Sequence, residues 1–572
     1  GSQRCVGGCA IPMVSCWTIW VTFRCEGCAT LDAVVDPSKG WAHMPLRRFN
    51  EAVRRLLCVA CMLGGLASVC IAQNSPLPPP SDPEAIQADT LVGAYYFPGW
   101  SQDDRWYCIK ALDDVLHPLL GYYREGDPTV ADWHIKWALE HGISFFAFDY
   151  YSFQGSEMLE EALQAMLCCR SIDQFKFCLN WCNHQEPETQ DAEELRRFGD
   201  VVIDAYLTHP SYLRIDGKPV LMILGGYSFV KTLGVDGAAQ AFGRFEERCR
   251  EAGLPGVYLV SCEGFIDGAE AVSRGLEAGI DAFCLYNYPY AGSSVTGPGG
   301  EYAEMSYEHL IEQGRGLWEH WRGLTDGRFW PTVMPGWDRR SWTKDQDLRR
   351  VGSTAELFER SLAWAKDAVN ADRVVMIEAW NEWGEGSVLE PSVEERFSYL
   401  EAVRRVFCPG VERPESEVPA PEDRPDVPLP RVDRWGFSFG TEGWTPTRLG
   451  DFRQTTGCIE GVALDNDPAI SSPKTYLPCE EYSAIAVRMR AWADAAASTE
   501  TETGEVFWST TRGGLSQSRS VTFQVPLDGE WRTHVIPVAD HPGWTGTVDS
   551  LRLDPVGRPG VRFQIDSVTI LP

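Results

Sequence analysis

Short apolar runs alternate with amphipathic segments through the middle of the chain. Continuous apolar runs separated by helical patterns indicate a parallel sheet covered on both faces. Eight such units over about 300 residues predict an α/β fold, a (β/α)8 barrel spanning residues 89–408. The expected strands are Leu91–Phe97, Ser144–Phe148, Phe175–Leu179, Pro219–Leu224, Val257–Ser261, Asp281–Leu285, Trp330–Met334 and Val374–Ile377. The expected helices include Val130–Glu140, Ala192–Leu207, Ala238–Ala252, Tyr307–Arg322 and Thr354–Asn370.

The pattern changes after the predicted barrel. Residues 409–431 are rich in Pro and Glu and have no periodicity, which predicts a linker between domains. Residues 432–572 carry strand-like segments between Gly, Pro and Asp turns and predict an all-β sandwich. The expected strands are Ala484–Ala491, Ser520–Val525, Trp531–Pro537, Val548–Leu553 and Val561–Ile570. Exposure of Trp435, Trp444 or Trp508 would indicate sugar binding, and a structural cap on the barrel is the alternative.

The N-terminal region has a different composition. Residues 1–43 hold five cysteines without helix or strand periodicity, and we expect a non-native upstream segment rather than a zinc site, because Cys25-x-x-Cys28 lacks a second ligand pair. Residues 44–73 combine four arginines with the apolar run Leu56–Ile71, which predicts an export signal too short to span a membrane. If this signal directs export, the mature protein is expected to be secreted or periplasmic. Lipid attachment at Cys70 is the weaker alternative, and the Pro-rich residues 74–88 form a linker.

Composition excludes some partners. A formal net charge of −30 disfavours nucleic acid and anionic membranes. An acidic polymer would be repelled unless the site carried a local basic patch, so a neutral glycan is the default. From Cys108 onward the chain has an odd number of cysteines, several within expected strands, which indicates buried thiols rather than a disulfide scaffold.

The densest candidate chemistry follows the last expected strand. After Val374–Ile377 the chain reaches acids, an amide and two indoles within nine residues. Such residues suit a sugar site, where ring faces stack on Trp and acids act on the glycosidic oxygen. A solvated turn has little use for Trp380 and Trp383. Glu378 could tune Glu382 or pair with an arginine.

Other strand ends carry the same mixture of aromatic, amide and acidic side chains. Because active sites of (β/α)8 barrels lie at the C-terminal ends of the strands, these residues are expected to meet. His184 is expected to be structural rather than a metal ligand, since no other ligands converge on it. Glu390 is expected either to bind sugar or to anchor its loop. The predicted substrate contacts are Tyr95, Trp100, Asp149, Tyr151, Asn180, Trp181, Glu263, Tyr286, Asn287, Trp337, Asp338, Trp380, Asn381, Trp383 and Glu390.

The stretch Ala379–Gly386, continuing to Leu389-Glu390-Pro391, resembles the motif of the WbsX-like family, which is related to the glycoside hydrolase family 99 endo-α-mannosidases and endo-α-mannanases. Tyr95–Trp100, Leu120–Tyr123 and Tyr212–Pro219 also match, so the resemblance covers about residues 90–407. The run before Asn381 differs from that of the family 99 enzymes, so their substrate does not transfer. The C-terminal region resembles jelly-roll modules attached to glycosidases.

The resemblance implies a retaining glycoside hydrolase without metal or cofactor that acts on a poly- or oligosaccharide. Glu382 would act as the base on the sugar 2-hydroxyl, and O2 would attack C1 to form a 1,2-anhydro sugar. Glu385 would be the general acid and then the base that activates water. From the residues alone, two carboxylates with different pKa values fit this route and a covalent glycosyl-enzyme equally. A polysaccharide-building glycosyltransferase and a silent glycan-binding protein are the alternatives.

Overall fold

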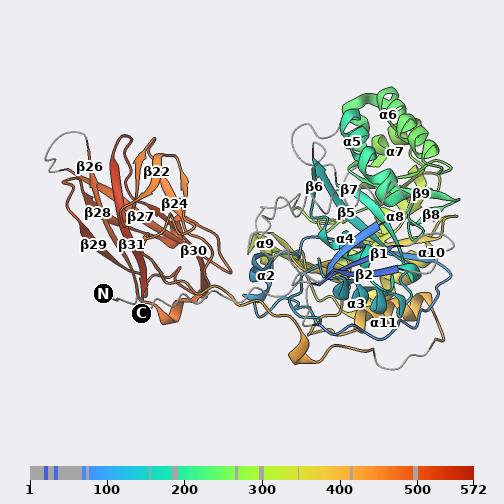
Figure 1. The fold of residues 1–572 in the computed structure, drawn as a ribbon, viewed down its shortest axis with the longest axis horizontal. Helices are drawn as coiled ribbons and strands as arrows, with labels where there is room; N and C mark the ends of the chain where they lie inside the picture. The colour runs from blue at the N-terminus through green and yellow to red at the C-terminus, as the bar shows by residue number, and fades with distance from the viewer. Residues whose placement is uncertain are drawn as a thin grey trace, which may run out of the picture.

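The computed structural model contains an N-terminal body and a C-terminal β domain, joined by an extended segment (Figure 1). The N-terminal body is a barrel of parallel strands with helices around it. The C-terminal domain consists of two antiparallel sheets. The structure describes residues 18–23, 31–35, 67–72, 77–153, 156–182, 191–264, 268–295, 302–344, 347–411, 416–493 and 500–572.

Eight strand positions close the barrel, which confirms the predicted fold class. The sheet closes because β17 pairs with both β4 and β14, while β13 pairs with β11. Pro331 separates β13 from β14, since proline has no N–H for the ladder, and together they occupy the seventh position. The strands are β4 (Leu91–Tyr96), β5 (Phe145–Phe153), β7 (Lys176–Cys182), β9 (Lys218–Leu224), β10 (Tyr258–Glu263), β11 (Ala282–Leu285), β13 (Phe329–Trp330), β14 (Thr332–Val333) and β17 (Val374–Ile377).

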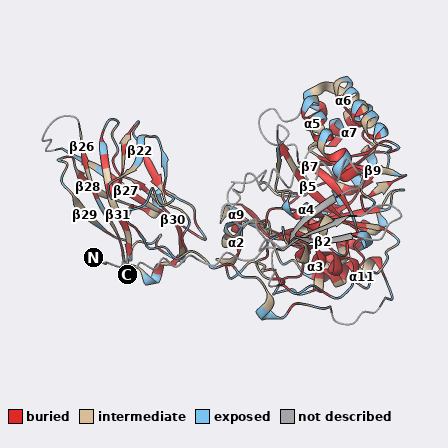
Figure 2. Cartoon of the chain, viewed as in Figure 1, coloured by how far each residue is buried: buried red, intermediate tan, exposed pale blue. Residues whose placement is uncertain are grey.

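The barrel strands are continuous apolar runs because both faces are covered. Every residue of β17 is buried, as is every residue of β4 and β7 after the first. Figure 2 shows the buried strands at the centre and the exposed positions on the outer sides of the helices. The sequence and burial patterns therefore agree strand by strand.

The helices begin where short polar side chains can satisfy free backbone N–H groups. Asp127, Asp191, Ser306 and Thr354 each accept a hydrogen bond from the first turn of the helix that follows. The helices are α2 (Asp103–Lys110), α3 (Pro128–Leu139), α4 (Glu161–Cys168), α5 (Ala192–Val202), α6 (Gly226–Glu251), α7 (Gly268–Ala278), α8 (Tyr307–Leu324), α9 (Arg340–Thr343), α10 (Ala355–Asp367) and α11 (Ser398–Phe407).

The C-terminal domain is a β-sandwich, as predicted. One sheet has the order β22-β23-β31-β26-β29, with β20 (Arg434–Trp435) beside β31, and the other has β21-β24-β30-β27-β28, with β25 (Leu477–Pro478) beside β30. The first sheet comprises β22 (Leu449–Thr455), β23 (Cys458–Ala463), β31 (Arg562–Leu571), β26 (Ala484–Trp492) and β29 (Arg532–Pro537). The second comprises β21 (Thr445–Thr447), β24 (Ala469–Ser471), β30 (Thr547–Asp554), β27 (Thr501–Thr510) and β28 (Ser520–Pro526).

The N-terminal region departs from the sequence analysis in one respect. Three antiparallel strands form there, β1 (Thr18–Phe23), β2 (Leu31–Val35) and β3 (Ala67–Ala72), in the order β2-β1-β3. Residues 1–43 therefore do contain strands, because β-branched and aromatic residues are dense in both segments. Most of the predicted export signal, and His184, lie outside the described residues, so export stays a prediction.

Ten of the cysteines from Cys108 onward are free thiols, and Cys168 is disulfide-bonded. No helix in the described part of the chain combines the length and apolarity needed to cross a membrane.

Candidate active site

A short hairpin carries the two predicted catalytic acids across the C-terminal end of the barrel. After β17 the chain forms β18 (Asn381–Glu382) and β19 (Ser387–Val388), which pair antiparallel. The backbone N–H of Trp380 donates to the carbonyl of Tyr95 at 2.7 Å, and this bond ties the hairpin to the end of β4. The neighbouring strand ends therefore fix where Glu382 and Glu385 lie.

A hydrogen-bonded chain of three side chains from other strands leads to Glu382. The hydroxyl of Tyr286 donates to Oδ2 of Asp149 at 2.6 Å and lies 3.2 Å from Oε1 of Glu382. Asn180 donates from Nδ2 to Oδ1 of Asp149 at 2.8 Å. The structure thus brings together predicted residues from β5, β7 and the end of β11, which are the second, third and sixth strands from β17 in the direction of β4.

Glu385 lies on the more open side of the hairpin. Its side chain is 13% exposed and its Oε1 lies 3.4 Å from Nε of Arg339, which also pairs with Asp347 at 3.3 Å. The loop is held by a bond from the backbone N–H of Asp338 to the Glu385 carbonyl at 2.6 Å. Gly386 has a φ of 62°, and an added Cβ would lie 2.8 Å from the Cβ of Asp338, so the turn requires glycine.

Burial and mutual repulsion raise the pKa values of the acids in this cluster. Burial, with the charges of Glu385 and Asp149, raises the pKa of Glu382 well above its usual range. Burial also raises the pKa of Glu385 to about 7, against the opposing effect of Arg339. The pKa of Asp149 rises to about 7, again mainly through burial, and that of Glu378 rises by burial and the Glu385 charge. Such a cluster holds protons at neutral pH and can exchange them with a substrate.

Several buried oxygens of the cluster have no hydrogen-bond partner among the described residues. They are Oε2 of Glu382, Oε2 of Glu385, Oδ1 of Asn180 and Oε1 of Glu378. Buried polar atoms are normally paired, so unpaired ones clustered beside acids mark positions for polar ligand groups. In the described ranges, no set of three or more His, Cys, Asp and Glu side chains is placed to hold a metal ion.

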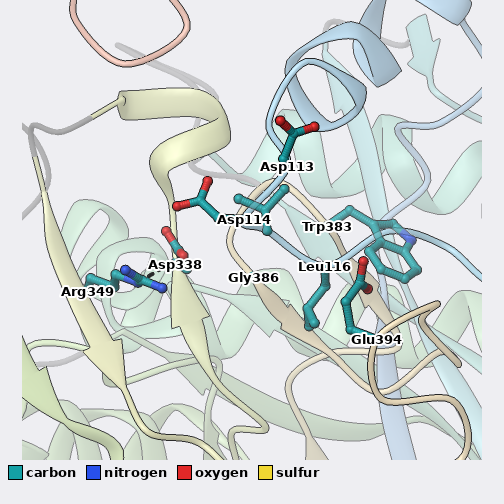
Figure 3. Close-up of a pocket in the computed structure, with 9 residues that line it drawn as sticks. Asp113, Asp114, Leu116, Asp338, Arg349, Trp383, Gly386 and Glu394 are labelled. Carbon is teal, nitrogen blue, oxygen red and sulfur yellow. Dashed lines mark ion pairs between the residues drawn. The ribbon is translucent and has the colours of Figure 1, made fainter. Parts of the chain in front are cut away.

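A pocket of about 320 Å³ adjoins the hairpin. Figure 3 shows Asp338 beside Arg349 and near Gly386, with Trp383 further along the pocket. Arg349 and Asp338 form an ion pair at 3.1 Å. Trp383 and Gly386 connect the pocket to the hairpin, but neither Glu382 nor Glu385 is among the lining residues. It is lined by Asp113, Asp114, Val115, Leu116, Asp338, Arg349, Trp383, Gly386 and Glu394.

Comparison with known proteins places this chain in a family. Residues 116–403 match the family described as "Glycosyltransferase WbsX", which is half of the chain and includes the acidic hairpin. The chain belongs to the WbsX family. A relative named "Uncharacterized protein WxcX", from Xanthomonas campestris pv. campestris, is 27% identical over 426 residues, which cover 65% of this chain and 56% of the relative. The WbsX-family chain thus spans little more than half the length of the curated relatives that it matches.

Two solved structures are similar to part of this WbsX-family chain. A "Glycoside hydrolase-like protein" is 18% identical, with a TM-score of 0.43, and covers 59% of this chain and 97% of its own. A family 99 endo-α-mannosidase from Bacteroides thetaiotaomicron is 16% identical, with a TM-score of 0.42, and covers 56% and 96%. The barrel assignment rests on the strand pairing described above.

Several predicted contact residues of the WbsX-family chain have packing roles. Trp100 stacks on Trp106, Trp181 stacks on Phe198, and Trp380 packs against His134 and Phe146; all three indoles are fully buried. Tyr95 is also buried and donates to the Leu285 carbonyl at 3.2 Å, with its ring 4.6 Å from that of Tyr286. These rings pack in the core rather than offering a free surface to a ligand.

Polar residues also act as anchors. Asn381 accepts from the N–H of Phe97 at 2.8 Å and donates to its carbonyl at 2.9 Å, which clamps the hairpin to β4. Buried Glu390 accepts from Tyr123 at 2.6 Å and from Trp383 at 3.2 Å, the arrangement of a loop anchor.

Glu263 accepts from the N–H of Tyr227 at 2.8 Å and from the Ser261 hydroxyl. The first bond ties the end of β10 to the start of α6, and the second lies within β10. The Glu263 carboxylate therefore has a structural role, because it accepts hydrogen bonds from within the protein.

The remaining predicted residues surround the cluster. Tyr151 is half-buried, hydrogen-bonds with Cys182 and has its pKa raised by burial and by nearby acids that include Asp149 and Glu382. Asn287 is half-buried beside Tyr286, and Trp337 is buried with Arg339 5.7 Å from its ring centroid.

Two residues outside the predicted set complete the site: Arg339, which faces Glu385, and Cys182, which contacts Tyr151 and Asp149. Arg339 directly follows Asp338, and Cys182 directly follows Trp181. This closeness to predicted residues was the sequence signal that could have identified them.

Proposed function

We propose that this WbsX-family chain is a glycoside hydrolase whose catalytic acids are Glu382 and Glu385. The observation that carries the proposal is the carboxyl cluster at the barrel mouth. Its acids have raised pKa values, and Glu382 and Glu385 each keep one carboxyl oxygen without a partner. Cleavage of a glycosidic bond needs one acid that gives a proton to the leaving oxygen and a second group that assists attack at C1.

The two glutamates take different steps in this proposal. Glu382 removes the proton of the sugar 2-hydroxyl, O2 attacks C1, and the C1–O bond to the leaving sugar breaks as Glu385 protonates that oxygen. Glu385 then takes a proton from water, which opens the 1,2-anhydro ring, and O2 recovers its proton from Glu382. A pKa of about 7 suits a group that first donates and then accepts a proton. Direct attack by a carboxylate on C1 remains the alternative route.

Asp149, Asn180 and Tyr286 position the base. Because the Tyr286 hydroxyl has one proton and donates it to Asp149, its oxygen is available to Glu382. The Tyr286 oxygen can therefore accept a hydrogen bond from protonated Glu382. When Glu382 is ionised, the Tyr286 O–H can rotate and donate to it without any movement of the ring. The three residues keep the carboxyl in place through both protonation states.

A glycosyltransferase is the second candidate, because the family is described by that activity. A nucleotide-sugar donor brings a diphosphate, and the cations beside this site, Arg339 and Arg349, are already paired with acids. A transferase of that kind would also work in the cytoplasm, whereas the signal predicted over residues 44–73 would export the chain. Both arguments favour water as the acceptor.

Digestion of a polysaccharide and oligosaccharide panel tests the proposal. The chain is compared with Glu382→Gln and Glu385→Gln, and a parallel set receives nucleotide sugars and acceptor glycans. We expect new reducing ends from the parent chain and a loss of about 100-fold or more in each variant. Equal activity in the parent and both variants would refute the site, and transfer from a nucleotide donor would favour the transferase.

A further inference from the structure

The sandwich buries the tryptophans that the sequence analysis considered for sugar binding. Trp435, Trp444 and Trp508 are at most 2% exposed and pack in the core between the sheets. Two other indoles, Trp492 and Trp531, are half-exposed. Trp492 ends β26 and Trp531 immediately precedes β29, so both lie on the sheet ordered β22-β23-β31-β26-β29.

A row of polar side chains crosses the outer face of that sheet. Arg453, Glu460, Gln564 and Arg490 are successive cross-strand partners on β22, β23, β31 and β26. Arg453 donates to Glu460 at 2.9 Å, Gln564 donates to Glu460 at 2.8 Å, and Arg490 donates to Gln564 at 2.9 Å. On β23, β26 and β31, the residues before and after each member of this row are buried in the core. Because successive side chains of a strand point to opposite faces of the sheet, the row lies on the outer face.

The two partly exposed indoles lie at the end of this row. The Arg490 guanidinium is 4.9 Å from the ring centroid of Trp531 and 5.6 Å from that of Trp492. Arg488, two residues earlier on β26, is 5.1 Å from Trp531. Cation–π contacts of this kind hold the rings in place, so two flat apolar surfaces stand beside fixed hydrogen-bonding groups.

The same face is locally basic although the chain carries a net charge of −30. Glu460 is paired with Arg453, and Asp566 is paired with Arg488. Arg490 instead donates to the neutral amide of Gln564. A third acid, Asp528, bridges to Trp492 and is paired with Arg532. Exposed Arg562, the cross-strand partner of Trp492, adds a further cation, so arginines outnumber these three acids. Arginine beside a partly exposed ring favours a ligand with both carboxylate groups and flat apolar faces.

We propose that this face, made by Trp492, Trp531, Arg490, Arg562 and Gln564, binds a polysaccharide that carries carboxylate groups. The indoles stack on sugar rings, and the two arginines pair with carboxylates of the bound chain. Gln564 and Glu460 fix the geometry of Arg490. The proposal concerns binding only and does not depend on the hydrolase activity.

Contacts between the sandwich and the barrel involve other parts of the domain. Lys344 pairs with Asp549 of β30 at 2.9 Å, and Arg512, in the turn after β27, pairs with Asp114 at 2.7 Å. Both sandwich residues belong to the second sheet or its connections. A polymer on the first sheet would therefore not compete with these domain contacts.

Affinity electrophoresis of the full chain tests the proposal. The chain carries Glu385→Gln in every sample so that cleavage cannot obscure binding, and the gels contain either polygalacturonate or neutral mannan. We expect retardation by polygalacturonate that weakens with added salt. Trp531→Ala and Arg490→Gln should each weaken the apparent Kd about tenfold or more. Phe439→Ala, at a 90% exposed aromatic of the same domain, is the control and should bind like the parent.

Thermal unfolding of each variant verifies that it is folded, and Arg490→Gln carries the test if Trp531→Ala unfolds. Equal retardation by mannan, or parental affinity in Arg490→Gln, would overturn the proposal. Absence of retardation in the parent chain would also overturn it. Because no turnover is measured, failure of the hydrolase assignment would leave these outcomes unchanged.

Discussion

Replacing Glu385 with Gln should stabilise the folded protein above neutral pH and leave it almost unchanged in acid. Burial raises the pKa of Glu385 from 4.5 to about 7 in the folded chain. Between these values the folded state binds more protons than the unfolded state, so the free energy of unfolding falls as pH rises through 7. At about 1.4 kcal/mol for each pH unit, the ionised group costs roughly 3 kcal/mol above pH 8. Gln cannot ionise and avoids that cost.

The assay is urea denaturation of the parent and variant at pH 4.5 and pH 8.5. The variant should gain about 3 kcal/mol at the higher pH and a few tenths at the lower. Glu395→Gln makes the same chemical change at an exposed position and should alter stability by less than about 0.5 kcal/mol at both. A variant that loses stability at pH 8.5, or gains equally at both pH values, would refute the reasoning.

Three further substitutions test separate contacts. Arg339→Gln removes the cation beside Glu385 and should move the basic limb of the kcat/KM profile upward by about one pH unit or more; a downward shift would contradict this. Tyr286→Phe removes the bond to Asp149 and should lower kcat about tenfold or more, while an unchanged kcat would exclude a positioning role. Arg512→Ala breaks a half-exposed interdomain ion pair and should cost about 1 kcal/mol or less by calorimetry, and a larger loss would show that the domains depend on each other.

Most of the barrel was predictable because its strands are buried on both faces. A strand forms at each of the eight expected positions. A short, continuous apolar run in an α/β chain is typical of a strand that is buried on both faces. The break at Pro331 was not predicted, and the helices named from the sequence do not include α2, α4, α7, α9 or α11. In the sandwich, β27 was missed because its sequence, TETGEVFWST, begins with polar residues that face solvent. Strands covered on one face give a weaker pattern.

The acids of the site were predictable and their cation was not. Glu382 and Glu385 stand out because acids are rare after a buried strand, whereas Arg339 is one of several charged residues in its loop. Only the fold shows that it faces Glu385. The indoles illustrate the opposite error: Trp100 and Trp181 were predicted to contact the substrate, but both are fully buried. Sequence alone does not distinguish a stacking platform from a core ring.

The central claim is that water accepts the sugar that the Glu382–Glu385 pair releases. Digestion of the substrate identified by the panel in H₂¹⁸O, followed by mass spectrometry, tests this most directly. Hydrolysis predicts one ¹⁸O at each new reducing end, with no labelled product from Glu385→Gln. Products without ¹⁸O, formed by transfer of the sugar to another glycan, would contradict the hydrolase assignment.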